Sequence, residues 1–425
     1  MPNRKSPPRT ALVIGGGVVG LTIALALQER GIATTLVDPG DPARAASWGN
    51  AGHIATEQVE PLASGKAIRS AWSRLFWRGG ALALPARGIG AWLPFSLRML
   101  AASRRSRFDA GQAALKSLLA TAMPAWRRLL DRCGAPELLR EDGHFLIWES
   151  DAGARKGRAA WAETDTGTAS FRDADAEELA VLAALLGRPP TGAIRFSGSG
   201  QIADLPKLAA ALSGAFEQAG GIVRQGAIAT LSVEARSAAA RLADGERLCA
   251  DAVIVAAGHA SAGLLRSLGH KVPLIAERGY HIETPTTDWP AGLPPVVFEE
   301  RSMIVTRFDS GLRAASFVEF NSATAPPDPR KWARLREHVG ALGLGFAEPV
   351  SEWMGIRPTL PDYLPAIGRS PRAQNLFYAF GHQHLGLTLA AATAEIVAAI
   401  VSEDTPPLDP APFDLQRFGR GRAAR

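Results

Sequence analysis

The stretch Ala-Leu-Val-Ile-Gly-Gly-Gly-Val-Val-Gly, residues 11–20, decides the fold of this 425-residue chain. Its first four residues form a short apolar run, which predicts a buried parallel strand. Gly15, Gly17 and Gly20 follow it with the spacing G-x-G-x-x-G. In such a turn the first glycine permits a tight bend and the second lets backbone approach a phosphate. The third glycine lets the next helix pack closely against the strand.

An apolar helix and a second strand complete this unit. The helix is expected to span Val18 to Arg30, with Val19 in its first turn. The strand is expected at 33–37 and is followed by Asp38. The Asp38 carboxylate can accept hydrogen bonds from a ribose hydroxyl. Strand, glycines, helix, strand and acid in this order indicate a dinucleotide-binding site. The alternative is a glycine-rich turn in some other α/β sheet.

Length and cysteine usage limit the possible classes of protein. A chain of 425 residues suits two intertwined domains. Cys133 and Cys249 match no metal-ligand or redox spacing, so we expect no metal site and a reducing compartment. The apolar run after the basic N-terminus is the strand–turn–helix unit itself, and no cleavage site follows it. The sequence therefore predicts an unprocessed, cytoplasmic protein.

A loop of small residues follows the second strand. Its polar side chains are Ser47 and Asn50, and Ala51 and Gly52 come directly after them. Small residues let backbone approach a ligand closely, so we expect this loop to cross the middle of the nucleotide cofactor. The alternative is a surface loop with helix-capping side chains.

The segment 61–108 is basic and aromatic. It contains nine Lys or Arg residues and no Asp or Glu, although the whole chain has a net charge of only +6. Its aromatic residues are Trp72, Phe76, Trp77, Trp92, Phe95 and Phe108. This combination predicts contact with an anionic membrane surface, and the alternative is a helical insertion packed on the protein. No recognisable nucleic-acid module surrounds the segment, so no nucleic-acid partner is expected.

The rest of the chain alternates between two kinds of pattern. Helices are expected at 110–133, with a bend before Pro124, and at 177–186, and a strand at 143–148. From residue 202 the pattern of the first unit resumes, with a helix at 205–220, a strand from 221 and a buried strand that ends in Ala257 and Gly258. Antiparallel strands are expected at 277–283, 302–306 and 312–320, and a helix at 330–339.

A second glycine-rich loop lies near the C-terminus, between a strand at 376–380 and an apolar helix that reaches Val401. Such a loop points backbone N–H groups and the positive end of the helix dipole at an anionic or electron-rich ligand. Its residues are Gly381, His382, Gln383, His384, Leu385, Gly386, Leu387 and Thr388. His53 and His382 are expected to satisfy local backbone groups. The Pro- and Arg-rich tail after Pro406 is expected to be poorly ordered.

Together these stretches resemble the D-amino acid oxidase/dehydrogenase superfamily of flavoproteins, and the bacterial D-amino acid dehydrogenases in particular. The marks of the resemblance are the first glycine turn with Asp38, the loop at 47–52, the strand at 253–258 and the paired stretches 355–368 and 381–386. The resemblance implies an α/β chain, α+β overall. A discontinuous Rossmann-like FAD-binding domain would comprise 1–60, 195–270 and 351–425. A substrate domain with a mixed or antiparallel sheet and helices would comprise 61–194 and 271–350.

The resemblance also implies roles for single residues. FAD would be held non-covalently by the first turn, the loop at 47–52, Ala257–Gly258, Gly355 and the loop at 381–388, with backbone at Val223 binding the adenine. Arg357 would pair bidentately with the substrate carboxylate, a role that its planar guanidinium suits. The alternative for this arginine is a structural salt bridge beside Asp362.

The remaining pocket residues follow from the same resemblance. Arg301 and Met303 would line the substrate pocket, and His384 would lie over the substrate. Relatives usually have a tyrosine near the carboxylate at a position that Met303 occupies here. Tyr280 or Tyr363 would then take the place of that tyrosine.

The function implied is FAD-dependent dehydrogenation of D-amino or imino acids, with cis-4-hydroxy-D-proline or D-proline favoured by the loop at 381–388. Hydride would pass to the flavin, and electrons would go on to a membrane quinone or another respiratory-chain acceptor. The protein would then lie on the inner face of the cell membrane. Two alternatives stay open: an oxygen-using glycine, sarcosine or D-amino acid oxidase, and a non-catalytic flavin-bound assembly protein.

Overall fold

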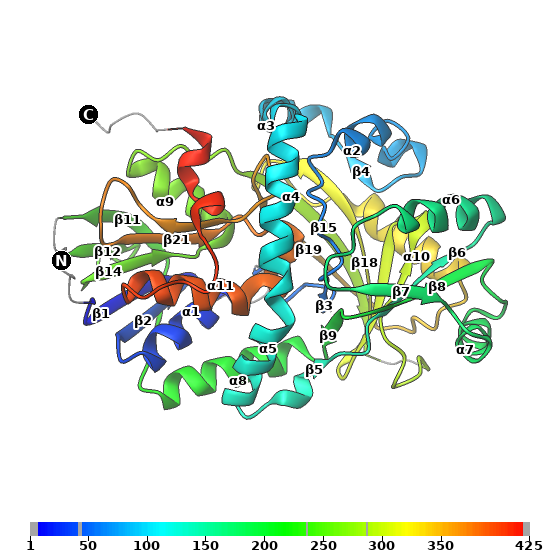
Figure 1. The fold of residues 1–425 in the computed structure, drawn as a ribbon, viewed down its shortest axis with the longest axis horizontal. Coiled ribbons are helices and arrows are strands. Elements are labelled where there is room, and N and C mark those ends of the chain that lie inside the picture. The colour runs from blue at the N-terminus through cyan, green and yellow to red at the C-terminus, as the bar shows by residue number, and fades with distance from the viewer. Residues whose placement is uncertain (1–6, 41–44, 235–236, 286–287, 420–425) are drawn as a thin grey trace.

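The computed structural model describes residues 7–40, 45–234, 237–285 and 288–419, and two large sheets dominate it (Figure 1). The first has six strands in the order β10-β2-β1-β14-β21-β20. Their bounds are β1 Thr10–Ile14, β2 Ala33–Asp38, β10 Ile222–Gln225, β14 Ala252–Val255, β20 Ala366–Arg369 and β21 Leu376–Phe380. All neighbours pair in parallel except β20 and β21. The predicted first strand and the predicted return strand are confirmed, since Val13 pairs with Ile254.

Helices cover one face of this sheet. They are α1 Val18–Glu29, α8 Leu205–Gln218 and α11 Gly386–Val401, which lie together in the lower left of Figure 1. The stretch Gln383–Val401 is long and apolar enough to cross a membrane, but 78% of it is buried inside the protein. It is therefore the central core helix of this layer.

A small antiparallel sheet covers the opposite face, and the sequence did not predict it. It consists of β11 Ile228–Val233, β12 Ala238–Leu242 and β13 Arg247–Ala250. Leu231, Ala238 and Ala240 pack against Leu12 and Val253 of the six-stranded sheet. Alanine has little strand propensity, so this run becomes a strand only through its packing on the larger sheet.

The second large sheet has the order β19-β15-β18-β17-β16-β6-β8-β7, and β4 Leu82–Ala83 pairs with β18. The other bounds are β6 His144–Trp148, β7 Ser170–Asp173, β8 Gly192–Ser197, β15 Ile275–Thr284, β16 Val296–Phe298, β17 Met303–Phe308, β18 Gly311–Asn321 and β19 Ser351–Thr359. The sheet is mixed, because β16 pairs with β6 in parallel whereas its other pairings between neighbours along this order are antiparallel. The predicted antiparallel strands are confirmed. Helices α6 Asp151–Ala162, α7 Ala176–Leu186 and α10 Pro329–Ala341 accompany this sheet.

Three short strands join the two halves: β3 His53–Ile54, β9 Gly200–Ile202 and β5 Leu139–Arg140. Helices α4 Arg105–Ala120 and α5 Ala122–Arg132 run along the middle of the molecule (Figure 1). The break between them at Thr121 confirms the bend predicted before Pro124.

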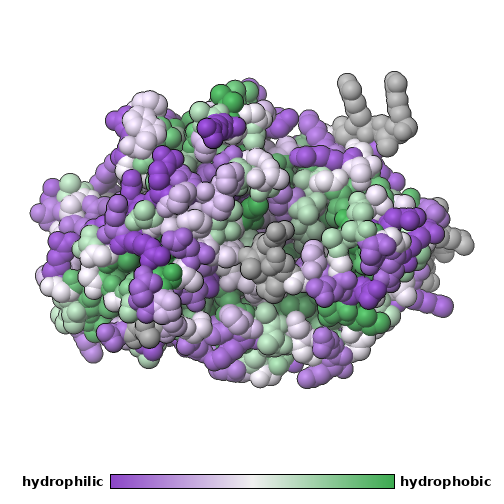
Figure 2. Space-filling model, turned by 180° about the vertical axis from the view of Figure 1, so that it is seen from behind, coloured by the Kyte–Doolittle hydropathy of each residue, from purple (hydrophilic) through white to green (hydrophobic). Residues whose placement is uncertain are grey.

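The basic segment 61–108 forms an outer layer at the top of the molecule. It contains α2 Gly65–Ser70, two 3-10 turns at Phe76–Arg78 and Ala86–Gly88, and α3 Ile89–Ala102. Phe95 is buried against Phe320. The other face of α3 exposes apolar side chains, and hydrophobic residues are visible among hydrophilic ones at the top of Figure 2. The exposed large hydrophobic residues of the segment are Leu62, Trp72, Trp77, Ile89, Leu93, Leu97 and Leu100.

The expectation of a poorly ordered tail is wrong for residues 407–419. Two 3-10 turns, Ala411–Phe413 and Leu415–Phe418, hold Phe413 and Leu415 in the core. Arg417 Nε donates to Asp362 Oδ2 at 2.6 Å and fixes the end of the segment. Two apolar anchors and one ion pair thus override a composition typical of disorder. Residues 420–425 lie outside the described residues.

Candidate active site

A cavity of about 1470 Å³ is lined by residues of both large sheets. Gly15, Gly17 and Asp38 line it from the six-stranded sheet. Met303 and Arg357 line it from the nine-stranded sheet. A cavity that continues from a glycine turn to a second sheet can hold a dinucleotide and a further small molecule side by side.

The glycine turn has the geometry that the sequence predicts. Gly15 has a φ of +110°, and its N–H donates to Val37 O at 2.8 Å. The N–H of Gly16 donates to Asp38 Oδ2 at 2.6 Å, and Ser47 Oγ accepts from the N–H of Val18 at 3.0 Å. These bonds hold the Asp38 carboxylate and the N-terminus of α1 against the cavity, where backbone N–H groups and the helix dipole favour a phosphate.

Most of the predicted cofactor residues line this cavity. They are Gly15, Gly17, Val19, Asp38, Ser47, Asn50, Ala51, Ala257, Gly258, Gly355, His382, Gln383, Gly386 and Leu387. A second group lies behind the lining and shapes it: Val18, Gly20, Gly52, Gly381, Leu385 and Thr388. Thr388, for example, accepts from the N–H of Ala55 at 3.0 Å and so ties α11 to the loop that follows β3.

The structure contradicts the role predicted for Val223. It lies in β10, at the edge of the six-stranded sheet, and its side chain is 47% exposed. The cavity is lined instead by residues 226–229, directly after that strand. The chain leaves the sheet at Gly226, whose N–H donates to the Asp38 carbonyl. The segment 226–229, rather than Val223, therefore lines this end of the cavity.

Arg357 reaches the other end of the cavity from β19. Its Nη1 donates to Phe317 O at 3.0 Å and lies 3.4 Å from Glu277 Oε1. Glu277 is fully buried and also accepts from Thr359 Oγ1 and Tyr363 OH. The alternative of a structural salt bridge is thus right in kind, but its partner is Glu277, because Asp362 pairs with Arg417. The guanidinium is fixed on one side and still borders the cavity, as a carboxylate anchor requires.

Gly279 lies beside this guanidinium. A Cβ on Gly279 would be 2.2 Å from Nη2 of Arg357. Replacing Gly279 with alanine should therefore displace the arginine, which can swing away, while the fold persists. We expect a rise in the KM for substrate of about tenfold, equivalent to about 1.4 kcal/mol. Steady-state kinetics normalised to bound flavin measure this rise, and a fall in flavin content without a change in KM would contradict it.

Met303 and the two tyrosines predicted for the pocket all line the cavity. Met303 is buried and lines the cavity. Tyr280 also lines it, but its OH donates to Glu319 Oε2 at 2.7 Å, and burial raises the pKa of this phenol. Tyr363 lines the cavity too and donates to Glu277 at 3.2 Å. Both tyrosines thus serve first to support buried carboxylates of the second sheet.

The prediction that Arg301 lines the pocket is wrong. Arg301 lies in a 3-10 turn before β17, and its Nε donates to Glu149 Oε1 at 2.6 Å. Ser302, with a φ of 50°, reverses the chain between this turn and the strand. The reversal carries Met303 to the cavity and leaves Arg301 outside the lining.

The histidines of this region have side-chain partners, so the expectation of backbone partners for His53 and His382 is wrong. His382 Nε2 lies 3.0 Å from Thr393 Oγ1, and His384 Nε2 lies 2.5 Å from Gln58 Oε1. Burial lowers the pKa of His382 and of His384 to about 3, and nearby Arg357 contributes to the second shift. Both imidazoles are therefore neutral at physiological pH.

The buried His382 makes stability depend on pH. Its pKa is lowered on folding, so below pH 6.5 the unfolded chain binds a proton that the folded chain does not. The loss of stability between pH 7 and pH 5 should be smaller by about 2 kcal/mol in His382→Gln than in the native sequence. Urea unfolding at the two pH values, with saturating FAD, measures this difference. Parallel losses in both proteins would refute the prediction.

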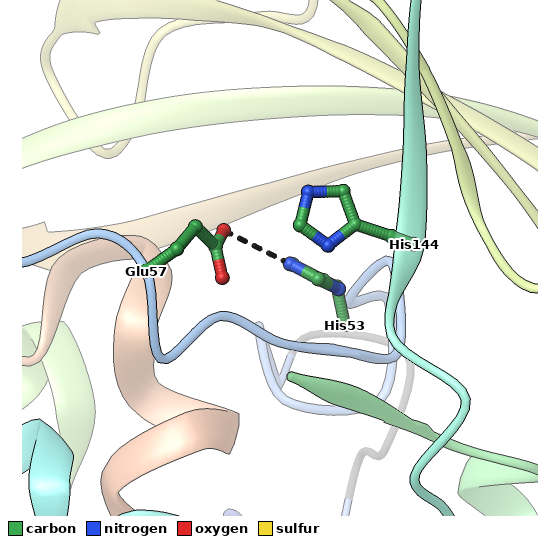
Figure 3. Close-up of side chains that lie close together, drawn as sticks. All are labelled: His53, Glu57 and His144. Atoms are coloured by element: carbon green, nitrogen blue, oxygen red, sulfur yellow. Dashed lines mark hydrogen bonds and ion pairs between the residues drawn. The ribbon is translucent and has the colours of Figure 1, made fainter. Parts of the chain in front are cut away.

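A group that the sequence did not predict lies beside the cavity: His53, Glu57 and His144 (Figure 3). His53 and Glu57 line the cavity, and His53 Nε2 lies 3.1 Å from Glu57 Oε1. The His53 and His144 rings meet edge to face at 4.5 Å, and Ser199 Oγ lies 2.9 Å from His144 Nδ1. His144 is far from the other two in sequence. The spacing of His53 and Glu57, which are four residues apart, was the only available signal.

Fold and cavity define a dinucleotide-dependent enzyme with a separate substrate sheet. The chain belongs to the FAD dependent oxidoreductase (DAO) family, which matches residues 10–400. It is 30% identical to the D-amino-acid oxidase of Bradyrhizobium diazoefficiens, over 96% of this chain and 99% of that protein. It is 29% identical to a D-amino acid dehydrogenase of Cereibacter sphaeroides, with 97% of each chain covered. Glycine oxidase from Geobacillus kaustophilus shares the fold, with a TM-score of 0.70, 20% identity, and coverage of 97% of this chain and 99% of that one.

The glycine turn fits the cofactor of this family. A Cβ on Gly15 would be 2.5 Å from Ala256 O, and a Cβ on Gly17 would be 3.2 Å from Ser47 Oγ. Only glycines leave the backbone here open to a pyrophosphate. FAD would be held by this turn and Asp38 at one end and by the loop at 381–388 at the other, and the protein is an FAD-dependent oxidoreductase.

Proposed function

We propose that this enzyme dehydrogenates D-amino or imino acids. The observation that carries the proposal is Arg357, whose guanidinium is fixed by Phe317 O and which lines the same cavity as Met303. Bound FAD supplies the two-electron acceptor for such an oxidation. The names of the relatives, D-amino-acid oxidase and D-amino acid dehydrogenase, support the substrate class.

The chain's own residues position the substrate and exclude water. Arg357 binds the carboxylate, and Met303 contributes an apolar wall. His384, neutral and close enough to Arg357 for the pKa of the imidazole to respond, offers a hydrogen-bonding group above the substrate. Positioning of this kind supplies much of the rate when the cofactor performs the chemistry.

Within this class we propose cyclic imino acids, and cis-4-hydroxy-D-proline first. His384 supports this choice, because a neutral imidazole at the cavity can bond a ring hydroxyl. An anaerobic flavin-bleaching screen of D-amino and imino acids tests it, with D-proline and both hydroxyproline epimers included. Bleaching by linear D-amino acids but not by cyclic ones would overturn the choice and leave the wider class intact.

We propose a quinone or another respiratory-chain component as the electron acceptor. The exposed Trp72 and Trp77, with Arg78 close to both rings, support contact with a membrane interface. Turnover with a soluble quinone analogue should therefore exceed peroxide release in air. Faster peroxide release would favour an oxygen-using oxidase instead.

The same surface supports a location on the inner face of the cell membrane. Flotation with anionic liposomes should carry the protein upward, and salt should weaken the effect. Replacing Trp72, Trp77 and Leu97 together with serine should abolish flotation without affecting turnover of a soluble acceptor. Flotation that is equal on neutral and anionic vesicles would contradict the electrostatic part.

A further inference from the structure

We propose that Glu57, held by His53, is the anionic half of the substrate site and receives the ammonium group of an amino acid whose carboxylate binds Arg357. This inference rests on the proposed function and names the residue that would recognise the amine. It follows from the burial of Glu57, its incomplete hydrogen bonding and its place on the same cavity as Arg357.

The first observation is a buried carboxylate with spare bonding capacity. Glu57 is 3% exposed and lines the cavity. Its Oε1 pairs with His53 Nε2 at 3.1 Å, whereas Oε2 is buried and has no hydrogen-bond partner among the residues that the structure describes. A buried carboxylate needs compensation for lost hydration, and one hydrogen bond to one of its two oxygens supplies only part of it. A ligand that brings N–H donors and a positive charge would supply the rest.

The second observation is that this carboxylate is ionised. Burial raises its pKa, but the nearby His53 and His144 outweigh burial and leave the Glu57 pKa at about 2. His144 carries no compensating charge at neutral pH, since burial lowers its pKa to about 3. Its Nδ1 is bonded to Ser199 Oγ, which fixes the ring behind the pair (Figure 3). The cluster therefore holds an ionised carboxylate against two imidazole rings.

The third observation is the position of Glu57 relative to Arg357. His384 Nε2 lies 2.5 Å from Gln58 Oε1, next to Glu57 in sequence. His382 pairs with Thr359, two residues after Arg357. Arg357 lowers the pKa of His384 and Glu57 raises it. A fixed cation and a fixed anion thus act on one neutral ring at the cavity wall. An amino acid with an ionised carboxylate and an ammonium group complements this pair of charges, and an acid that lacks the amine does not.

The other carboxylates that line the cavity are less suited to the role. Asp38 accepts from backbone N–H groups at the glycine turn. Glu277 is already bonded to Arg357, Thr359 and Tyr363. Glu60 lines the cavity three residues after Glu57, but it is only half-buried, so water can solvate it. Glu60 is therefore a matched control.

A divalent metal is the competing occupant. One ligand atom each from His53, Glu57 and His144 lies within 4.8 Å of the other two. The hydrogen bond between His53 and Glu57 and the edge-to-face contact of the two rings favour an organic cation over a metal. Metal analysis of the purified holoenzyme decides between them. A stoichiometric transition metal that Glu57→Gln loses would overturn the proposal.

The main experiment compares two ligands of the same shape. D-proline carries the amine, and tetrahydrofuran-2-carboxylate has an oxygen in its place. Their affinities for the holoenzyme can be measured as KM and Ki, or as dissociation constants from perturbation of the flavin spectrum. In Glu57→Gln we expect D-proline to bind at least tenfold more weakly and the oxygen analogue to bind equally or more tightly. Glu60→Gln should change neither affinity more than twofold.

Two further variants make the outcome decisive. Glu57→Asp keeps the charge and should recover part of the preference for D-proline, whereas Arg357→Ala should weaken both ligands. Equal weakening of both ligands in Glu57→Gln, or no change in either, would overturn the proposal. If no amino acid bleaches the flavin of the native sequence, the proposed function fails. The spectral affinities of the two ligands would still show whether Glu57 recognises an amine.

Discussion

Replacing Arg357 with alanine is expected to raise the KM for a D-amino or imino acid roughly 100-fold, because a charge-assisted bidentate pair contributes about 3 kcal/mol. Flavin content should stay unchanged, since the glycine turn that faces the pyrophosphate belongs to the six-stranded sheet, whereas Arg357 lies in the other large sheet. Glu277, the buried partner of Arg357, keeps its bonds from Thr359 and Tyr363. Loss of the arginine still takes a cationic partner from this buried carboxylate, so we also expect lower stability, and the kinetics are normalised to bound flavin.

Arg301→Ala is the matched control. This arginine belongs to the same sheet region but pairs with Glu149 and lies outside the cavity lining. Its removal should leave the KM within about twofold, even if the loss of a partly buried ion pair lowers stability by about 1 kcal/mol. Steady-state kinetics and thermal unfolding of both variants separate the two effects. A KM for Arg357→Ala that matches the native value would disprove the carboxylate anchor.

The features that could be predicted from sequence are those set by neighbouring residues. The turn at residues 15–20 can be identified from the spacing of its glycines. A strand precedes it directly, and the helix, the second strand and Asp38 follow within 25 residues. Hydrophobic periodicity likewise located α8, α10 and the long strands of the second sheet. The geometry of these elements depends little on the rest of the chain.

The features that could not be predicted depend on contacts between distant segments. The strand β12 is an alanine run that the six-stranded sheet holds extended, and the tail is ordered by Phe413 and Leu415. Arg301 and Met303 are two residues apart, yet one reversal at Ser302 sends them to different surroundings. The cluster of His53, Glu57 and His144 forms only where β3 meets the second sheet (Figure 3). No local pattern carries that information.

Cofactor-binding and substrate-binding residues are distributed differently along the chain. The residues that face the pyrophosphate lie together in one turn at 15–20, so their spacing identifies a dinucleotide site. The residues that would choose the substrate come from β19, the loop after β3 and the turn before α11. Substrate choice in this chain is thus a property of the assembled sheets. Arg357, Met303 and His384 were accessible through the family resemblance, whereas Glu57 was not.

Replacing Gly20 with alanine is expected to abolish FAD binding and to destabilise the protein by more than about 3 kcal/mol, because rigid backbone cannot yield as a side chain does. A Cβ on Gly20 would be 1.8 Å from the carbonyl oxygen of Gly15. Relief requires α1 to move away from β1, and that movement would open the turn that faces the pyrophosphate. Flavin content after purification and the midpoint of urea unfolding measure the two effects.

Gly214→Ala provides the control. Gly214 lies inside α8, and within the described part of the chain no heavy atom outside its own helical neighbourhood lies within 4 Å of the Cβ position. Alanine there should raise stability by about 0.5–1 kcal/mol through its helix propensity and leave flavin content unchanged. A Gly20→Ala protein with full flavin and native stability would show that α1 does not need its close approach to the turn. The same chemical change thus has opposite signs at two helical glycines, and only Gly20 faces the backbone of the cofactor turn.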